Sequence, residues 1–382
     1  MSKGAVSPLD HALLVSRPVA PRRGQPLTSG LSSLFLALDP RFRPRSVALI
    51  FDRSEFMYAR AIEVLLTSRK IEVTCWPISS ASPEEATHEV SNLLDSWGKV
   101  LPLCVGSSHA TLTAVTISVF TARRCPILQV VQSVLYRVGS TSQHIRLEPQ
   151  FEIAEILTHL GARISGGWEG VWFEEHLREL SHFLIESAHG CVAPLEVIQR
   201  LARQTDSERL LSPRVKGTEI AIPLFQEVLD RFESAGCLEL NQGRLKFINE
   251  KHRAYCSGGW LSLYVQAAFD QMQEDVFLHC TRQDITLELA YPTPLEVSIP
   301  LTVAVDGRLC FFFCVSSSHA NLNVLFEASE RLQDYFGATV LMLSIDEFYP
   351  EDQERARLLG IPVCVGDELK NMETWLMEIF LE

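Results

Sequence analysis

The sequence lacks several features that would assign it to a common class of protein. No apolar run reaches the roughly 18–20 residues that a membrane-spanning helix needs. The stretch MSKGAVSPLDHALLVSRP has too short an apolar segment for a signal peptide. The 10 cysteines include no CxxC pair, which argues against a zinc site or a secreted disulfide scaffold. We therefore expect a cytoplasmic protein with no membrane segment and no resident metal.

Positive charge is also scarce. The 34 Lys and Arg residues face 47 Asp and Glu residues, a net charge of −13. A chain this acidic is a poor general binder of nucleic acid or anionic membranes. Residues 256–382 hold 6 basic and 20 acidic residues, a net −14, against +1 for residues 1–255. Nucleic acid is therefore not expected to bind the C-terminal part.

The 382 residues, 47% of them hydrophobic, predict two or three folded domains. Residues 1–145 alternate between apolar runs and amphipathic helical patterns. Near-continuous apolar strands separated by such helices are typical of a parallel sheet covered on both faces. Ligands of these sheets bind at the carboxyl ends of the strands. The expected strands are 11–18, 45–52, 70–78, 100–107 and 125–131.

Residues 146–255 form amphipathic helices followed by two short strands around Asn241-Gln242-Gly243. Helices followed by a turn-centred hairpin predict a winged helix. The helical segment IPLFQEVLDRFESAG is acidic, so a linker and dimerisation role is favoured over DNA binding. Residues 256–382 predict an α/β unit with a mixed sheet, in which Asp306-Gly307 marks a hairpin.

Three segments of the C-terminal half resemble a family of CRISPR-associated nucleases: GRLKFINEKHRAYCSGGWLSLYV, RLCFFFCVSS and IPVCVGDELKNMETWL. Those proteins join a Rossmann-like sensor of cyclic oligoadenylates, the CARF domain, to a winged helix and a PD-(D/E)xK domain resembling restriction endonucleases. The resemblance implies an α/β chain with the three corresponding units: a sensor over 1–145, a winged-helix linker over 146–255 and a nuclease-like unit over 256–382.

In the family, carboxylates on a helix and a hairpin hold a divalent ion, and a lysine lies beside them. The ion activates water and stabilises the phosphodiester transition state. Carried over by position, these groups are replaced here by Ser262, Pro300, Phe313 and Val315. We expect no metal cofactor and no catalytic residues at these positions. The nearest alternative carboxylates, Glu296 and Asp306, are too far apart along one strand to clamp one ion.

The resemblance also implies a nucleotide site in the N-terminal unit. The segment after the first strand is basic and contains Ser16, Arg17, Arg22 and Arg23. The segment after the fourth contains Ser107, Ser108 and His109, which could donate to a phosphate at the start of a helix. A serine cap and a solvated basic loop are the competing interpretations.

The sequence thus favours a catalytically inactive, homodimeric member of this family that acts in antiviral defence by binding a cyclic oligoadenylate or a protein partner. One alternative is an active Mg²⁺- or Mn²⁺-dependent DNA or RNA endonuclease switched on by cyclic oligoadenylate. A weaker alternative is a winged-helix regulator.

Overall fold

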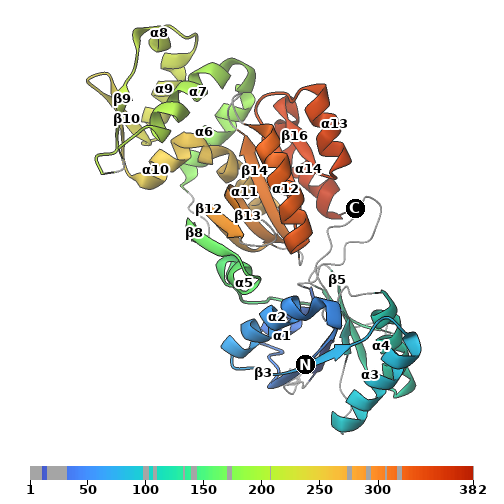
Figure 1. The fold of residues 1–382 in the computed structure, drawn as a ribbon. Coiled ribbons are helices and arrows are strands. Elements are labelled where there is room, and N and C mark those ends of the chain that lie inside the picture. Colours follow the sequence, from blue (N-terminus) through green and yellow to red (C-terminus); the bar gives the residue numbers. More distant parts are fainter. Residues whose placement is uncertain are drawn as a thin grey trace.

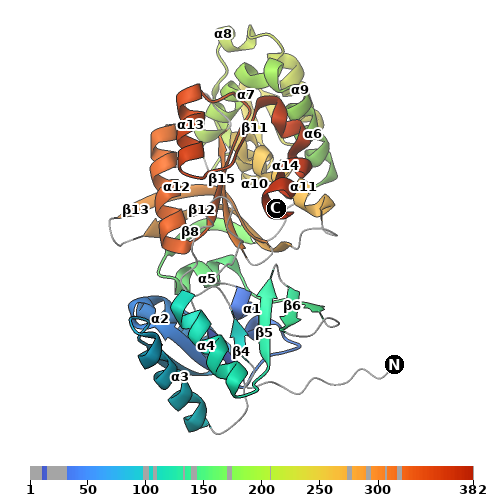
Figure 2. The same cartoon turned by 90° about the vertical axis from the view of Figure 1, so that its right-hand side faces the viewer.

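The computed structural model describes residues 11–14, 32–97, 103–105, 110–131, 134–138, 144–169, 174–206, 208–272, 278–289, 294–305, 308–315 and 321–381. Three sheets organise these residues, and the N-terminal sheet lies at one end of the molecule (Figures 1 and 2). No helix in these ranges is both long enough and apolar enough to span a membrane.

The N-terminal sheet has the strand order β3-β2-β1-β4-β5-β6-β7. The first five are parallel, as predicted: β3 (Glu72–Ile78), β2 (Ser46–Asp52), β1 (His11–Leu14), β4 (Leu103–Val105) and β5 (Ile127–Val131). The antiparallel strands β6 (Val134–Arg137) and β7 (His144–Arg146) extend this sheet and were not expected.

Helices cover both faces of this sheet because its strands are apolar on both faces. Val47, Leu49 and Phe51 of β2 pack in the cluster of α1 (Ser32–Leu38) and α2 (Phe56–Ser68). The alternate residues Ala48 and Ile50 pack with α3 (Pro83–Trp97) and α4 (Ala110–Ala122). This is the doubly wound arrangement that the strand and helix pattern predicts.

Helix α5 (Ile153–His159) and strand β8 (Arg163–Glu169) lead from this unit to the rest of the chain (Figure 1). Arg69, the residue that caps the C-terminus of α2, forms an ion pair with Glu155 of α5. Tyr335 Oη donates to the Leu160 carbonyl at 3.0 Å. Strand β8 is the edge of the C-terminal sheet, although the sequence analysis assigned these residues to the middle unit.

The middle unit consists of helices and a three-stranded antiparallel sheet, in the order β10-β11-β9. The turn of its predicted hairpin has Gln242 and Gly243 with φ of 50° and 72°. Its elements are α6 (Glu175–Glu186), α7 (Ala188–Arg203), β9 (Leu211–Arg214), α8 (Gly217–Ile220), α9 (Phe225–Ser234), β10 (Leu238–Asn241), β11 (Arg244–Phe247) and α10 (Glu250–Ala254).

The C-terminal unit is built on a mixed sheet of order β16-β15-β14-β13-β12-β8. Side chains alternate across β14, so Phe311 and Phe313 belong to one apolar cluster and Cys310 and Phe312 to the other. After a π-helical turn at Tyr255–Gly259, its elements are α11 (Trp260–Gln271), β12 (Leu278–Leu289), β13 (Leu295–Val305), β14 (Arg308–Val315), α12 (Leu322–Phe336), β15 (Thr339–Ser344), α13 (Pro350–Leu358), β16 (Val363–Val365) and α14 (Met372–Leu381).

Three neighbouring strands of this sheet are irregular at one level. The pairing register places Asp284 of β12 opposite Gly167 of β8 and opposite Pro300 of β13. Asp284 has φ of 48°, and Gly166 and Gly167 have φ of 69° and 72°. Pro300 has no N–H to donate to the ladder. Strands β12 and β13 change packing partners at this level. On one side of it their side chains pack with α11, and on the other side they pack in the apolar cluster that includes α5.

We predict that Gly167→Ala destabilises the protein more than Gly243→Ala. Both glycines have φ of 72°, so each alanine incurs the same left-handed cost of about 1–2 kcal/mol. A Cβ at residue 167 would also lie 2.4 Å from the Gln283 carbonyl oxygen, whereas at residue 243 it meets nothing within 4 Å. Equal losses in melting temperature for the two variants would show that stability does not depend on the close approach of β8 to β12 at Gly167.

Candidate functional site

The four positions that the resemblance aligns with catalytic groups, Ser262, Pro300, Phe313 and Val315, lie in or beside the C-terminal core. Ser262 of α11 is buried, with 1% of its surface exposed, and Phe313 and Val315 of β14 are buried as well. Pro300 of β13 is partly buried. None of these side chains carries a carboxylate.

Ser262 is not beside Phe313 or Val315 but beside the residue between them. Its hydroxyl donates to Cys314 Sγ at 3.4 Å. Because side chains alternate along a strand, Phe313 and Val315 point to the opposite face of the sheet. Phe313 pairs with Met342 of β15 and belongs to the same apolar cluster as that residue. Burial raises the pKa of the Cys314 thiol to about 12, so the sulfur next to Ser262 is neutral.

A small pocket opens next to Ser262. The irregular level of the sheet forms one wall of it, and the π-helical turn before α11 forms another. The turn includes Gly258, whose φ of 129° is not helical and marks a kink between α10 and α11. The residues that line the pocket are Lys251, Tyr255, Gly259, Ser262, Leu263, Gln283 and Asp284.

Asp284 supplies the single carboxylate among these lining residues. Aspartate tolerates the left-handed conformation better than most residues, because its short polar side chain bonds locally. Burial raises the pKa of Asp284 from its ordinary value of 3.8 to about 6, and the positive charge of Arg253 opposes the shift. Arg253 is itself held by Glu250 and by the Ala202 carbonyl, which accepts from Nη1 at 2.9 Å.

A buried amide network fixes the strand on which Asp284 lies. Gln283 Nε2 donates to Gln266 Oε1 of α11 at 2.7 Å, and Gln266 Nε2 donates to Thr281 Oγ1 at 3.1 Å. Tyr255, on the opposite wall, donates its hydroxyl to the Leu177 carbonyl of α6 at 3.0 Å. Hydrogen bonds therefore hold the walls of the pocket, and its lining includes one carboxylate, that of Asp284, and the hydroxyls of Tyr255 and Ser262.

Sequence reasoning missed Asp284. It considered the carboxylates of Glu296 and Asp306 instead. Glu296 is exposed on β13, opposite Glu288, and Asp306 lies outside the described residues. A lone aspartate before an apolar run gave no sign of its left-handed conformation or of the pocket.

The predicted nucleotide ligands Ser16, Arg17, Arg22, Arg23, Ser107, Ser108 and His109 also lie outside the described residues. The strands that precede the two segments are neighbours in the parallel sheet, with Leu14 paired with Val105. The last described residues of these two strands therefore lie next to each other at the carboxyl edge of the sheet.

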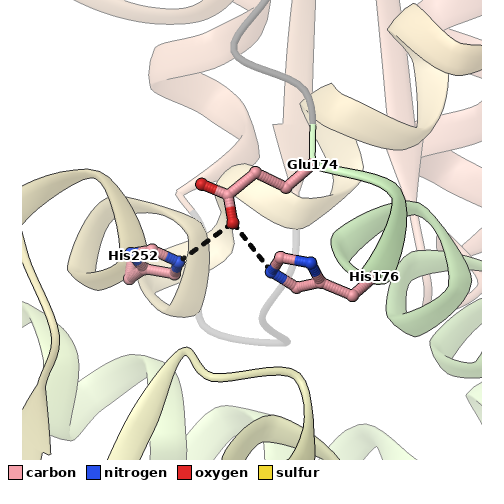
Figure 3. Close-up of side chains that lie close together, drawn as sticks. All are labelled: Glu174, His176 and His252. Carbon is pink, nitrogen blue, oxygen red and sulfur yellow. Dashed lines mark ion pairs between the residues drawn. The ribbon is translucent and has the colours of Figure 1, made fainter.

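A second cluster, formed by Glu174, His176 and His252, was not expected from the sequence. The Glu174 carboxylate lies between the two rings (Figure 3). Glu174 Oε2 is 2.8 Å from His176 Nε2 and 3.8 Å from His252 Nε2. Among the described residues, these three could together hold a metal ion.

No family model and no curated protein matches the chain. Solved structures of the same fold cover 90–98% of it. Protein VC1899 from Vibrio cholerae is 19% identical over 98% of both chains, with a TM-score of 0.76. Can2 from Sulfobacillus thermosulfidooxidans, in complex with cyclic tetra-adenylate, is 13% identical over 97% of this chain and 99% of its own, with a TM-score of 0.64.

A third similar structure is that of a type III CRISPR defence DNA nuclease activated by cyclic oligoadenylate. It is 12% identical over 90% of this chain and 47% of its own, with a TM-score of 0.52. At these identities the likeness shows a shared fold.

We predict that Asp284→Asn stabilises the protein at about pH 8 but hardly at pH 4. Because the pKa of Asp284 is raised in the folded state, ionisation of this carboxyl lowers the free energy of unfolding. This loss is absent below about pH 4 and complete above about pH 6. Asparagine keeps the left-handed backbone and removes the charge. The gain at pH 8 should be about 1–3 kcal/mol.

The measurement is the difference in melting temperature between variant and parent at the two pH values. Glu239→Gln, which neutralises an exposed carboxylate on β10, is the matched control and should show no such pH-dependent gain. A loss of stability for Asp284→Asn at pH 8 would mean that the ionised carboxylate makes favourable contacts.

Proposed function

We propose that this chain is a sensor of cyclic oligoadenylate in type III CRISPR defence whose C-terminal unit has lost nuclease activity. The proposed sensing role rests on the likeness, over 97% of the chain, to Can2, whose structure contains cyclic tetra-adenylate. The proposed ligand site is the carboxyl edge of the parallel sheet, where the segments after β1 and β4 begin side by side. The basic residues of the first segment would offset the phosphate charge.

We further propose that the C-terminal unit is a PD-(D/E)xK-like domain without its metal site and that the middle unit is a winged-helix linker. Metal-assisted hydrolysis needs several oxygen ligands around the ion. The corresponding positions carry a buried hydroxyl, a pyrrolidine ring, a phenyl ring and an isopropyl group. The net charge of −14 in residues 256–382 also opposes binding of a polyanion.

The proposal includes a homodimer formed through the N-terminal unit, since the family's sensors build one ligand site across a two-fold axis. Exposed apolar side chains on the β6–β7 end of the sheet support an interface there: Tyr136, Val138 and Ile145 are 43%, 53% and 38% exposed. An edge of this kind is normally covered or charged.

The alternative function is a metal-dependent nuclease that is activated by the same ligand and uses displaced groups. Asp284 is the observation in its favour, because it brings a carboxylate into a pocket beside Ser262. One carboxylate without a second oxygen ligand does not hold Mg²⁺ or Mn²⁺ firmly, so we rank this alternative second.

Cyclic tetra-adenylate, or a ring of another size, should raise the melting temperature of the dimeric protein by several degrees. A ligand that binds only the folded state stabilises it, by about 2.7 kcal/mol at 100 times its dissociation constant. Arg17→Glu should abolish the shift, and Arg209→Glu, which reverses an exposed charge in the middle unit, should retain it. A dimer, verified by light scattering, that responds to no ring size would contradict the proposed sensing role.

Purified protein should not cut single-stranded DNA, supercoiled DNA or RNA with Mg²⁺ or Mn²⁺, with or without cyclic oligoadenylate. The described pocket offers too few oxygen ligands to hold the ion that would activate water. Metal-dependent cutting that Asp284→Asn abolishes and Glu296→Gln leaves intact would establish the alternative instead.

A further inference from the structure

Two chain segments bring three metal-ligating side chains together at the junction of the middle and C-terminal units. Glu174 is the N-cap residue of α6, with an extended backbone, and His176 lies in the first turn of that helix. His252 belongs to α10, where the Asn249 side chain accepts from its backbone N–H at 2.9 Å and caps the helix. The start of α6 and the capped helix α10 thus fix the backbone positions from which the three side chains extend.

The geometry points to a site for one zinc ion, or a similar first-row divalent metal, held by Glu174 Oε2, His176 Nε2 and His252 Nε2. Zinc binds imidazole nitrogen and carboxylate oxygen at about 2.0–2.2 Å, so tetrahedral ligand atoms lie roughly 3.3 Å apart. The two measured separations, 2.8 and 3.8 Å, lie on either side of that value. All three ligand atoms lie within 4.8 Å of one another.

The surroundings suit a cation of this kind. His252 is 5% exposed, and its Nε2 faces the Glu174 carboxylate, so the ring can offer that nitrogen to a metal ion. The side chains of His176 and Glu174 are 47% and 38% exposed, which leaves a route for the metal and room for water at the fourth position. Three protein ligands with a water in the fourth place are a common coordination for zinc.

This site is separate from the pocket beside Ser262 and independent of the proposed nucleotide sensing. Its ligand set of two imidazoles and one carboxylate favours zinc over the hard ions Mg²⁺ and Ca²⁺, which prefer oxygen. A bound ion would tie the start of α6 to α10 within the middle unit.

The test is titration of the full-length, chelator-treated protein with Zn²⁺ alone, followed by calorimetry and by metal analysis after dialysis. We expect one ion per chain and a higher melting temperature. Glu174→Gln and His176→Gln should each weaken binding at least tenfold, because each removes one of three ligands. Both residues are exposed enough for these variants to fold, unlike the more deeply buried His252.

His88→Gln, at an exposed histidine of α3, is the matched control and should bind zinc as the parent does. Co²⁺ should give the visible absorption of a tetrahedral site without a thiolate band, which separates this cluster from the cysteines. Failure of the parent to bind one zinc ion, or unchanged binding in Glu174→Gln and His176→Gln, would overturn the proposal and leave a simple ion pair.

Discussion

The C-terminal unit depends on the close approach of three backbones at one level of its sheet. Gly167 leaves no room for a Cβ, because one would lie 2.4 Å from the Gln283 carbonyl oxygen. Asp284, next along β12, adopts a left-handed conformation opposite it. Strained residues of this kind persist only where the surrounding structure holds them. Here the amide network through Gln266 and the pairing of β8 hold Asp284 in the pocket wall.

The side chains at this level do not form the set of oxygen ligands that a divalent ion needs. A divalent ion needs converging oxygen ligands, but Phe313 lies in the apolar cluster of Met342, and Ser262 meets a neutral thiol on the other face. An ion placed among phenyl and aliphatic groups would lose its hydration without replacement. Asp284 is the one carboxylate among the residues that line the pocket. Its raised pKa reflects the free-energy cost of burying a charge at that position.

The sequence was a good guide where burial sets the pattern. The five parallel strands, the hairpin at Gly243 and the strands and helices of the C-terminal unit follow from apolar periodicity and turn residues. Strands β6, β7 and β8 were missed because they are short, polar or glycine-containing, and their pairing depends on distant partners. The pocket and the Glu174 cluster depend on tertiary contacts between segments far apart in the chain, which no local pattern records.

Side-chain contacts and chain connections together run from the N-terminal unit to the C-terminal pocket. Helix α2 is joined to α5 by Arg69 and Glu155, α5 leads into β8, and β8 leads to α6. Helix α6 holds the pocket wall through Leu177 and Tyr255, and its first residues face α10 at His252. Contiguity alone does not transmit a signal, since coupling requires an element with two arrangements that both sites bias. Strand β8 belongs to this route, and its tight pairing with β12 at Gly167 holds it in the arrangement described here.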